Sequence, residues 1–86
     1  MNISQMISEF IAKNFLQGQS QGFTPSTSLI ELGILDSIGI LKVMRFLEEN
    51  FSIKIEDEEY IPEYYVSVER IESFVKDKLA AKTMSA

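Results

Sequence analysis

The sequence predicts an all-α fold: a small bundle of three main helices and one short helix, with a long first loop. Apolar residues recur at steps of three and four residues in three stretches, which is the spacing of one helix face. Ile53 and Ile55 alternate briefly as in a strand, but their stretch is too short and too charged for a sheet. The three helical stretches span residues 2–16, 36–50 and 67–79.

Length and composition indicate one globular domain. The chain has 86 residues, and 45% of them are hydrophobic, which is too large a share for a disordered chain. We expect a single domain over residues 1–86, with a folded core over about 3–79 and a frayed tail over 80–86.

The residue types that are missing argue against an enzyme. The chain has no cysteine, histidine or tryptophan, so it lacks the commonest general base, the thiolate nucleophile and the usual zinc ligands. We therefore expect neither catalytic residues nor a metal site. The net charge of −5 disfavours nucleic acid and favours a basic protein partner. No apolar run approaches the ~20 residues of a membrane span, and no signal peptide is recognisable, which predicts a cytoplasmic protein.

The first predicted helix is followed by a polar loop over residues 17–28. A capping-box pattern at Ser28 and Glu31 predicts one short turn there, and Gly33 fits its stop. The apolar face of the first helix consists of Ile3, Met6, Ile7, Phe10, Ile11 and Phe15.

Asp36 has the side chain of a helix N-cap, so we expect the second helix to begin there and to end near Asn50. In the loop that follows, Ile53 and Ile55 are the expected apolar anchors, and Pro62 begins a short helical turn. Ser67 is the expected cap of the last helix. The buried face of the second helix comprises Ile40, Val43, Phe46, Leu47 and Phe51, and that of the last helix Val68, Ile71, Phe74, Val75 and Leu79.

Ser37 follows the predicted cap and has two interpretations. Serine and aspartate are ordinary residues at the start of a helix, so the pair can serve capping alone. Alternatively, the hydroxyl of Ser37 projects into solvent at the positive end of the helix dipole, where an attached phosphodiester would be favourably placed.

The residues around Ser37 resemble the phosphopantetheine attachment site of the acyl carrier protein family, which includes peptidyl and D-alanyl carriers. The resemblance rests on an acidic-Leu-Gly lead-in, an Asp-Ser-Ile motif, and an apolar helix that ends in an acidic turn and a phenylalanine. It covers the order of the elements over roughly residues 3–79 and implies a four-helix bundle of acyl-carrier type. The matching segments are Glu31-Leu32-Gly33, Asp36-Ser37-Ile38 and residues 45–55.

The resemblance also implies a function. A phosphopantetheinyl transferase would attach 4′-phosphopantetheine from coenzyme A to Ser37, and Asp36 would help to orient the transferase. The imported thiol would carry an acyl or aminoacyl group as a thioester, which accords with a chain without cysteine. An acyl- or aminoacyl-loading ligase and downstream acyl-transferring enzymes would be the partners of this monomeric carrier, which is not itself an enzyme.

Two departures from the pattern of fatty-acid carriers indicate the kind of carrier. Two residues, Ile34 and Leu35, separate Gly33 from Asp36, as in D-alanyl and stand-alone aminoacyl carriers. The first half of the serine helix also lacks the acidic residues of fatty-acid carriers. Enzymes that dock those carriers through basic patches are therefore expected to bind this chain poorly.

The neighbouring face of the second helix is the predicted docking surface for partners. Its apolar members could instead be core, and its two cations could instead be only solvated helix charges, for instance paired with Glu48 or Glu49 at helical spacing. Gly39 either eases crowding beside the serine or lets a partner approach the backbone. The predicted docking residues are Ile38, Leu41, Lys42, Met44 and Arg45.

A second class of function stays open on the sequence: an acidic helical adaptor that binds a partner without a prosthetic group. The acidic run over residues 56–59 is either a solvated loop or an electrostatic contact for a basic partner or a divalent ion. The identity of the cargo is not encoded in any motif of the chain.

Overall fold

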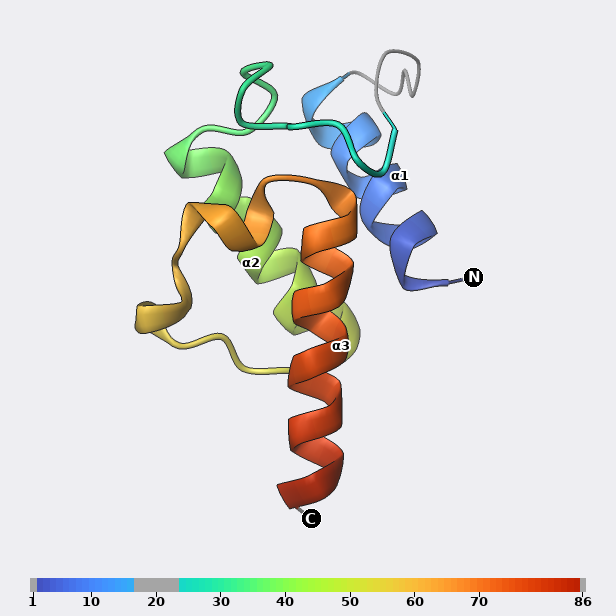
Figure 1. Ribbon diagram of the computed structural model, residues 1–86, viewed down its shortest axis with the longest axis vertical. Helices are drawn as coiled ribbons and strands as arrows, with labels where there is room; N and C mark the ends of the chain where they lie inside the picture. The colour runs from blue at the N-terminus through green and yellow to red at the C-terminus, as the bar shows by residue number, and fades with distance from the viewer. Residues whose placement is uncertain (1, 17–23, 86) are drawn as a thin grey trace.

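The computed structural model describes residues 2–16 and 24–85, and the all-α prediction is confirmed (Figure 1). Within those residues the chain forms three α-helices and two short 3-10 helices. In chain order the elements are α1 (Ile3–Phe15), α2 (Ser37–Phe51), η1 (Asp57–Glu59), η2 (Pro62–Tyr65) and α3 (Val68–Ser85). Residues 17–23, most of the predicted first loop, lie outside the described residues.

The predicted helix starts are confirmed by their caps. The Asp36 carboxylate accepts a hydrogen bond from the Gly39 N–H at 2.7 Å, so α2 begins at the next residue, Ser37. The Ser67 hydroxyl likewise accepts from the Arg70 N–H at 3.2 Å at the start of α3. Side-chain caps therefore determine where α2 and α3 begin.

The predicted turn between α1 and α2 is also present. The Leu32 N–H donates to the Ser28 carbonyl at 3.2 Å, and Gly33 ends the turn with a φ of +74°, a left-handed conformation that glycine adopts without strain. The Leu29 N–H donates to the Val66 carbonyl at 2.7 Å, which ties this loop to the segment before α3. The loop that leads to α2 is thereby anchored to the rest of the fold.

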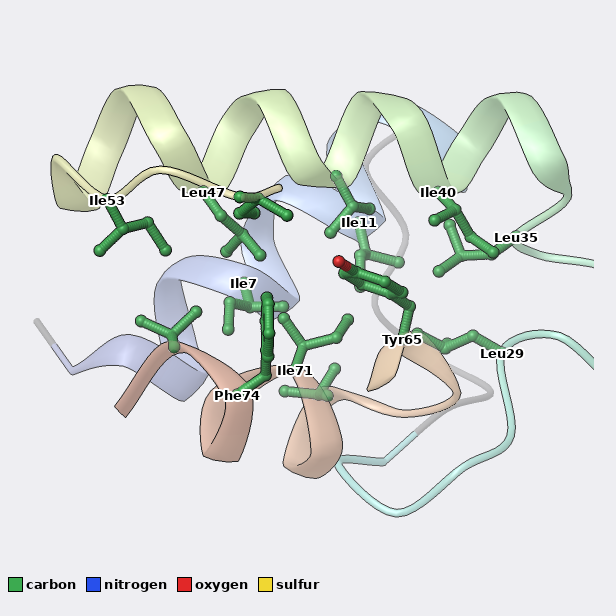
Figure 2. Packing of buried hydrophobic residues seen from close by; sticks show 14 residues of the cluster. Ile7, Ile11, Leu29, Leu35, Ile40, Leu47, Ile53, Tyr65, Ile71 and Phe74 are labelled. Atoms are coloured by element: carbon green, nitrogen blue, oxygen red, sulfur yellow. The ribbon is translucent and has the colours of Figure 1, made fainter. Parts of the chain in front are cut away.

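The core lies between α1, α2 and α3, with η2 closing one end (Figure 2). Ile7, Val43 and Ile71, one from each α-helix, are fully buried, as the three predicted stripes require. Ile53 and Ile55 are buried too, so the predicted anchors of the loop after α2 are confirmed. Stacking of the Phe10 and Phe46 rings, with centroids 4.1 Å apart, joins α1 to α2 at the edge of the core. Because the core buries one face of α2, it also determines which side chains of α2 point outward.

Three features differ from the prediction. Leu29 and Leu35, which the helical stripes do not include, are core residues with exposed fractions of 0% and 2%. The acidic run forms a 3-10 turn, because Glu56 and Glu59 cap each other reciprocally. The last helix continues to Ser85, past the Leu79 boundary that we expected for the folded core, and projects beyond the other elements in Figure 1.

Replacing a leucine on the inward face of α2 should cost far more than replacing one on its outward face. Leu47 is fully buried, so Leu47→Ala should lower the free energy of unfolding by about 2–5 kcal/mol. Leu41 is 53% exposed, so Leu41→Ala should change it by less than about 0.5 kcal/mol. Urea unfolding of both variants measures the difference, and equal losses would contradict the assignment of the two faces.

Candidate functional site

The start of α2 presents Ser37 to solvent. Ser37 is the first helical residue after the Asp36 cap, and both residues are exposed. Within the described residues, the Ser37 hydroxyl forms no hydrogen bond. Because the first N–H groups of a helix lack acceptors within the helix, this position favours an anion close to the hydroxyl. The structure therefore places, at an electropositive helix end, a hydroxyl that no described residue engages.

Gly39 is buried behind the serine, and its role is intramolecular. A Cβ at this position would lie 3.2 Å from Cε1 of Phe15 and 3.3 Å from Cδ2 of Leu35, closer than most such contacts. The chain's own side chains therefore fill the space that a partner would need to reach this backbone. Of the two interpretations of Gly39, relief of crowding is confirmed.

Tyr60 links the segment between the two 3-10 turns to the start of α2. Its hydroxyl donates a hydrogen bond to the Ser37 carbonyl oxygen at 3.1 Å. The two residues are 23 positions apart, so helical periodicity gives no sign of this contact. Tyr60 is a residue of the site that sequence reasoning missed.

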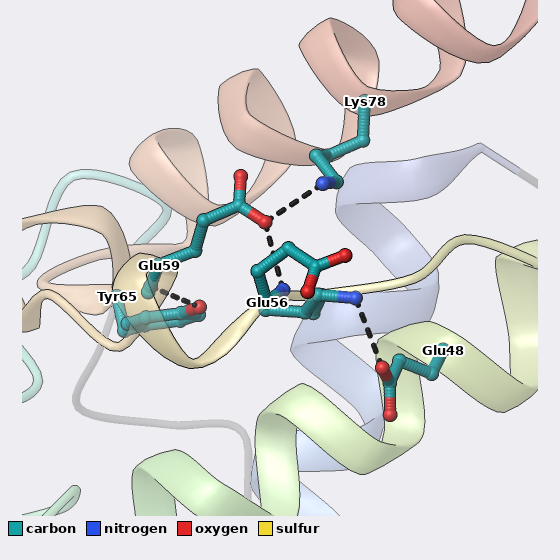
Figure 3. A network of polar contacts seen from close by, with 6 residues as sticks. Glu48, Glu56, Glu59, Tyr65 and Lys78 are labelled. Carbon is teal, nitrogen blue, oxygen red and sulfur yellow. Dashed lines mark hydrogen bonds and ion pairs between the residues drawn. The ribbon is translucent and has the colours of Figure 1, made fainter.

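A network of carboxylates fixes the segment that carries Tyr60 (Figure 3). Glu48 of α2 accepts a hydrogen bond from the Ile55 N–H at 2.9 Å. Glu59 accepts from the Glu56 N–H at 2.9 Å and pairs with the Lys78 ammonium of α3 at 2.7 Å. These contacts attach the segment after α2 to both α2 and α3. Part of the acidic run is therefore structural rather than only solvated.

The electrostatics of this network follow from its contacts. Burial raises the pKa of the Glu59 carboxyl, but the Lys78 hydrogen bond and charge and the Glu56 N–H outweigh it, so the pKa lies below its ordinary value. The Tyr65 hydroxyl donates to the Glu59 carbonyl at 3.0 Å inside the core. Burial and then the charge of Glu59 raise the pKa of Tyr65, so this phenol stays protonated at neutral pH.

The residues predicted for docking lie together on the outward face of α2. Ile38 and Leu41 are 65% and 53% exposed, so the alternative that this face is core is wrong for these two residues. All five predicted residues border one open hollow of about 400 Å³ next to the start of α2. The hollow is lined by Ile38, Leu41, Lys42, Met44, Arg45, Glu48, Ile55 and Asp57.

The structure shows the two cations as solvated helix charges, without the pairing to Glu48 or Glu49 that was one form of this alternative. Within the described part of the chain, neither Lys42 nor Arg45 forms an ion pair, although Glu48 and Glu49 stand at helical spacing. Glu48 instead turns to the Ile55 backbone. Both cations are exposed beside the hollow, which the carboxylates of Glu48 and Asp57 also line.

The described residues contain neither a metal site nor a membrane-spanning helix. In residues 2–16 and 24–85, no group of three carboxylates converges as a metal site would need. None of the helices described is both long and apolar enough to cross a bilayer.

Fold and site together define a small α-helical domain that displays a serine at the start of its second helix. Comparison with known proteins gives the same class. The family model for the phosphopantetheine attachment site matches residues 6–75. A probable acyl carrier protein, PigG, from Serratia sp. (strain ATCC 39006), is 32% identical over 66 residues, which cover 77% of this chain and 76% of that protein.

The chain belongs to the family of phosphopantetheine-binding carrier domains. It is an acyl carrier protein-like carrier rather than an enzyme, and its prosthetic group is 4′-phosphopantetheine. The start of α2 fits this group, because it combines an exposed hydroxyl with the N–H groups that favour a phosphodiester. When bound, the group supplies the thiol that this chain, without cysteine, lacks.

Removing the Asp36 cap should weaken the fold and leave the first turn of α2 less ordered. We expect Asp36→Ala to lower the free energy of unfolding by about 1 kcal/mol, because the Gly39 N–H loses its acceptor. Asp36→Asn keeps an acceptor oxygen and should lose only part of that amount. Urea unfolding of both variants provides the test, and an Asn variant as unstable as the Ala variant would contradict the capping role.

Stability should fall in acid because of Glu59. Its pKa is lowered in the folded state, so its contribution is complete above the ordinary pKa of about 4.5 and is lost as pH falls through the lower, folded-state pKa. Glu59→Gln should therefore flatten the fall in unfolding free energy between about pH 5 and pH 3. The matched control is Glu72→Gln, since Glu72 pairs with the exposed Lys76 at 3.6 Å and should contribute little. Equal pH profiles for wild type and Glu59→Gln would contradict this role.

Proposed function

We propose that Ser37 is the residue that carries 4′-phosphopantetheine. One observation supports this most strongly: the Ser37 hydroxyl is exposed and unengaged at the first position of a capped helix. The family model spans this position, and the Asp-Ser-Ile motif has the spacing of the family's attachment site. No other serine in the chain stands in that motif.

The attachment is a phosphoryl transfer from coenzyme A catalysed by a separate transferase. The Ser37 oxygen forms a bond to the phosphorus next to the pantetheine, and the bond from that phosphorus to the bridging oxygen breaks. The adenosine bisphosphate portion of coenzyme A leaves. A base of the transferase takes the hydroxyl proton, since this chain has no histidine to do so.

Asp36 would serve the transferase as well as the fold. Its Oδ1 is engaged by the Gly39 N–H, and within the described residues its second oxygen accepts no hydrogen bond. The side chain is exposed beside Ser37, so this oxygen is available to the transferase or to a metal ion that the transferase brings. Asp36 thereby orients the transferase at the serine that it precedes.

The outward face of α2 is the proposed docking surface for the enzymes that use the carrier. Ile38, Leu41 and Met44 offer an apolar contact next to Ser37, and Lys42 and Arg45 offer charge. A partner that covers this face would meet the arm where it leaves the helix. Such partners are an acyl- or aminoacyl-loading ligase and the downstream enzymes that receive the thioester.

Within the family, we place the chain with D-alanyl, peptidyl and stand-alone carriers. The two residues between Gly33 and Asp36 and the lack of acidic residues early in α2 support this placement. We further propose that the carrier works as a cytoplasmic monomer without nucleic acid. A fatty-acid synthase enzyme that loads this chain as fast as its own carrier would contradict the placement.

Modification of a single serine should be visible in the intact mass. Incubation with coenzyme A and a broad-specificity phosphopantetheinyl transferase should add one phosphopantetheine to the wild type. Ser37→Ala should gain nothing, whereas Ser73→Ala, which removes an exposed serine of α3, should be modified like the wild type. Modification of Ser37→Ala would refute the assignment. A folded wild type that gains no mass would instead favour an adaptor without a prosthetic group.

A further inference from the structure

Tyr60 holds the backbone of the residue that follows the cap of α2. Its hydroxyl donates a hydrogen bond to the Ser37 carbonyl oxygen at 3.1 Å. Ser37 is the first residue of α2, so the same oxygen is also an acceptor for the first turn of the helix. The peptide group that joins Ser37 to Ile38 is therefore held from two sides, by the helix and by a segment 23 positions away.

Tyr60 is itself anchored on the side of α3. Its N–H donates to the Asp57 carbonyl at 3.1 Å, and its ring packs against the core cluster. The preceding residue, Glu59, accepts a hydrogen bond from the Lys78 ammonium at 2.7 Å and, through its carbonyl, one from the Tyr65 hydroxyl at 3.0 Å (Figure 3). Because Lys78 belongs to α3, polar contacts run from α3 through η1 to the first residue of α2.

We propose that Tyr60 is a positioning residue for the attachment of phosphopantetheine: by holding the Ser37 peptide group, it fixes the direction in which Ser37 presents its hydroxyl to the transferase. The proposal rests on the attachment at Ser37 proposed above. The hydrogen bond is to the carbonyl oxygen, so Tyr60 leaves the hydroxyl available while it restricts the backbone that carries it. A nucleophile held near the geometry of attack reacts faster than one whose backbone must first be ordered.

Removing only the hydroxyl of Tyr60 separates positioning from binding of the transferase. Tyr60→Phe keeps the ring that packs on the core and loses the donor, so urea unfolding should show a folded variant. Single-turnover reactions with coenzyme A and excess transferase give a maximum rate and a half-saturating transferase concentration. We expect Tyr60→Phe to lower the maximum rate roughly two- to tenfold, the size expected for one hydrogen bond, and to leave the half-saturating concentration unchanged.

Tyr64 provides the matched control. Its ring stacks on that of Phe74 with centroids 5.0 Å apart, and its hydroxyl forms no hydrogen bond within residues 2–16 and 24–85. Tyr64→Phe removes the same atom from a tyrosine of the neighbouring turn and should be modified at the wild-type maximum rate. The proposal is overturned if Tyr60→Phe keeps the wild-type maximum rate, if it changes only the half-saturating concentration, or if both variants lose equally.

The contact can also be measured on the chain before any attachment. The carbonyl ¹³C signal of Ser37 responds to hydrogen bonding at its oxygen. Tyr60→Phe should therefore shift this signal, whereas Tyr64→Phe should leave it in place. A Ser37 carbonyl signal that is the same in wild type and Tyr60→Phe overturns the proposal.

Failure of this proposal is distinguishable from failure of the attachment site. A wild type that is modified at Ser37, together with Tyr60→Phe modified at the same maximum rate, refutes the positioning role alone. A wild type that gains no phosphopantetheine, or a Ser37→Ala variant that gains one, refutes the attachment at Ser37, and the role of Tyr60 is refuted with it.

Discussion

The hydrogen bond from the Gly39 N–H to the Asp36 carboxylate is the contact on which the geometry of the site depends. It fixes where α2 begins, and the helical repeat then decides which way every later side chain points. Ile40 turns into the core and Ser37 turns to solvent, with the hydroxyl left unengaged. Leu35, just before the cap, is buried and anchors the loop that leads to α2. Moving the helix start by one residue would therefore expose an apolar side chain.

The polar network between α2 and α3 gives the site its second support. The segment after α2 has little regular structure, yet Glu48, Glu59 and Lys78 hold its backbone at defined distances (Figure 3). Tyr60 then reaches from this segment to the carbonyl of Ser37. Part of the acidic composition of the chain therefore builds the frame around the serine. On the outward face of α2, Lys42 and Arg45 form no ion pair within the described residues and share a hollow with Glu48 and Asp57.

Local rules predicted the parts of the molecule that are themselves local. The caps at Asp36 and Ser67 and the three apolar stripes depend on neighbours within four residues, and the structure contains them. The burial of Leu29 was not predicted, because Leu29 lies in a loop, where no helical periodicity indicates which side chains face the core. The Tyr60 and Lys78 contacts join residues 23 and 19 positions apart, and only the packed fold brings them together. The five residues proposed for docking were predictable as one face, but the lack of ion pairs there among the described residues was not.

We propose that a preformed, capped helix start presents Ser37 to the prosthetic group without rearrangement of the bundle. Comparing ¹H–¹⁵N spectra of the chain before and after attachment of phosphopantetheine tests this claim most directly. We expect large shifts confined to Ser37 and its neighbours through Gly39, together with Tyr60, while the amides of α3 stay in place. Shifts centred on another serine, or spread over the whole bundle, would contradict it.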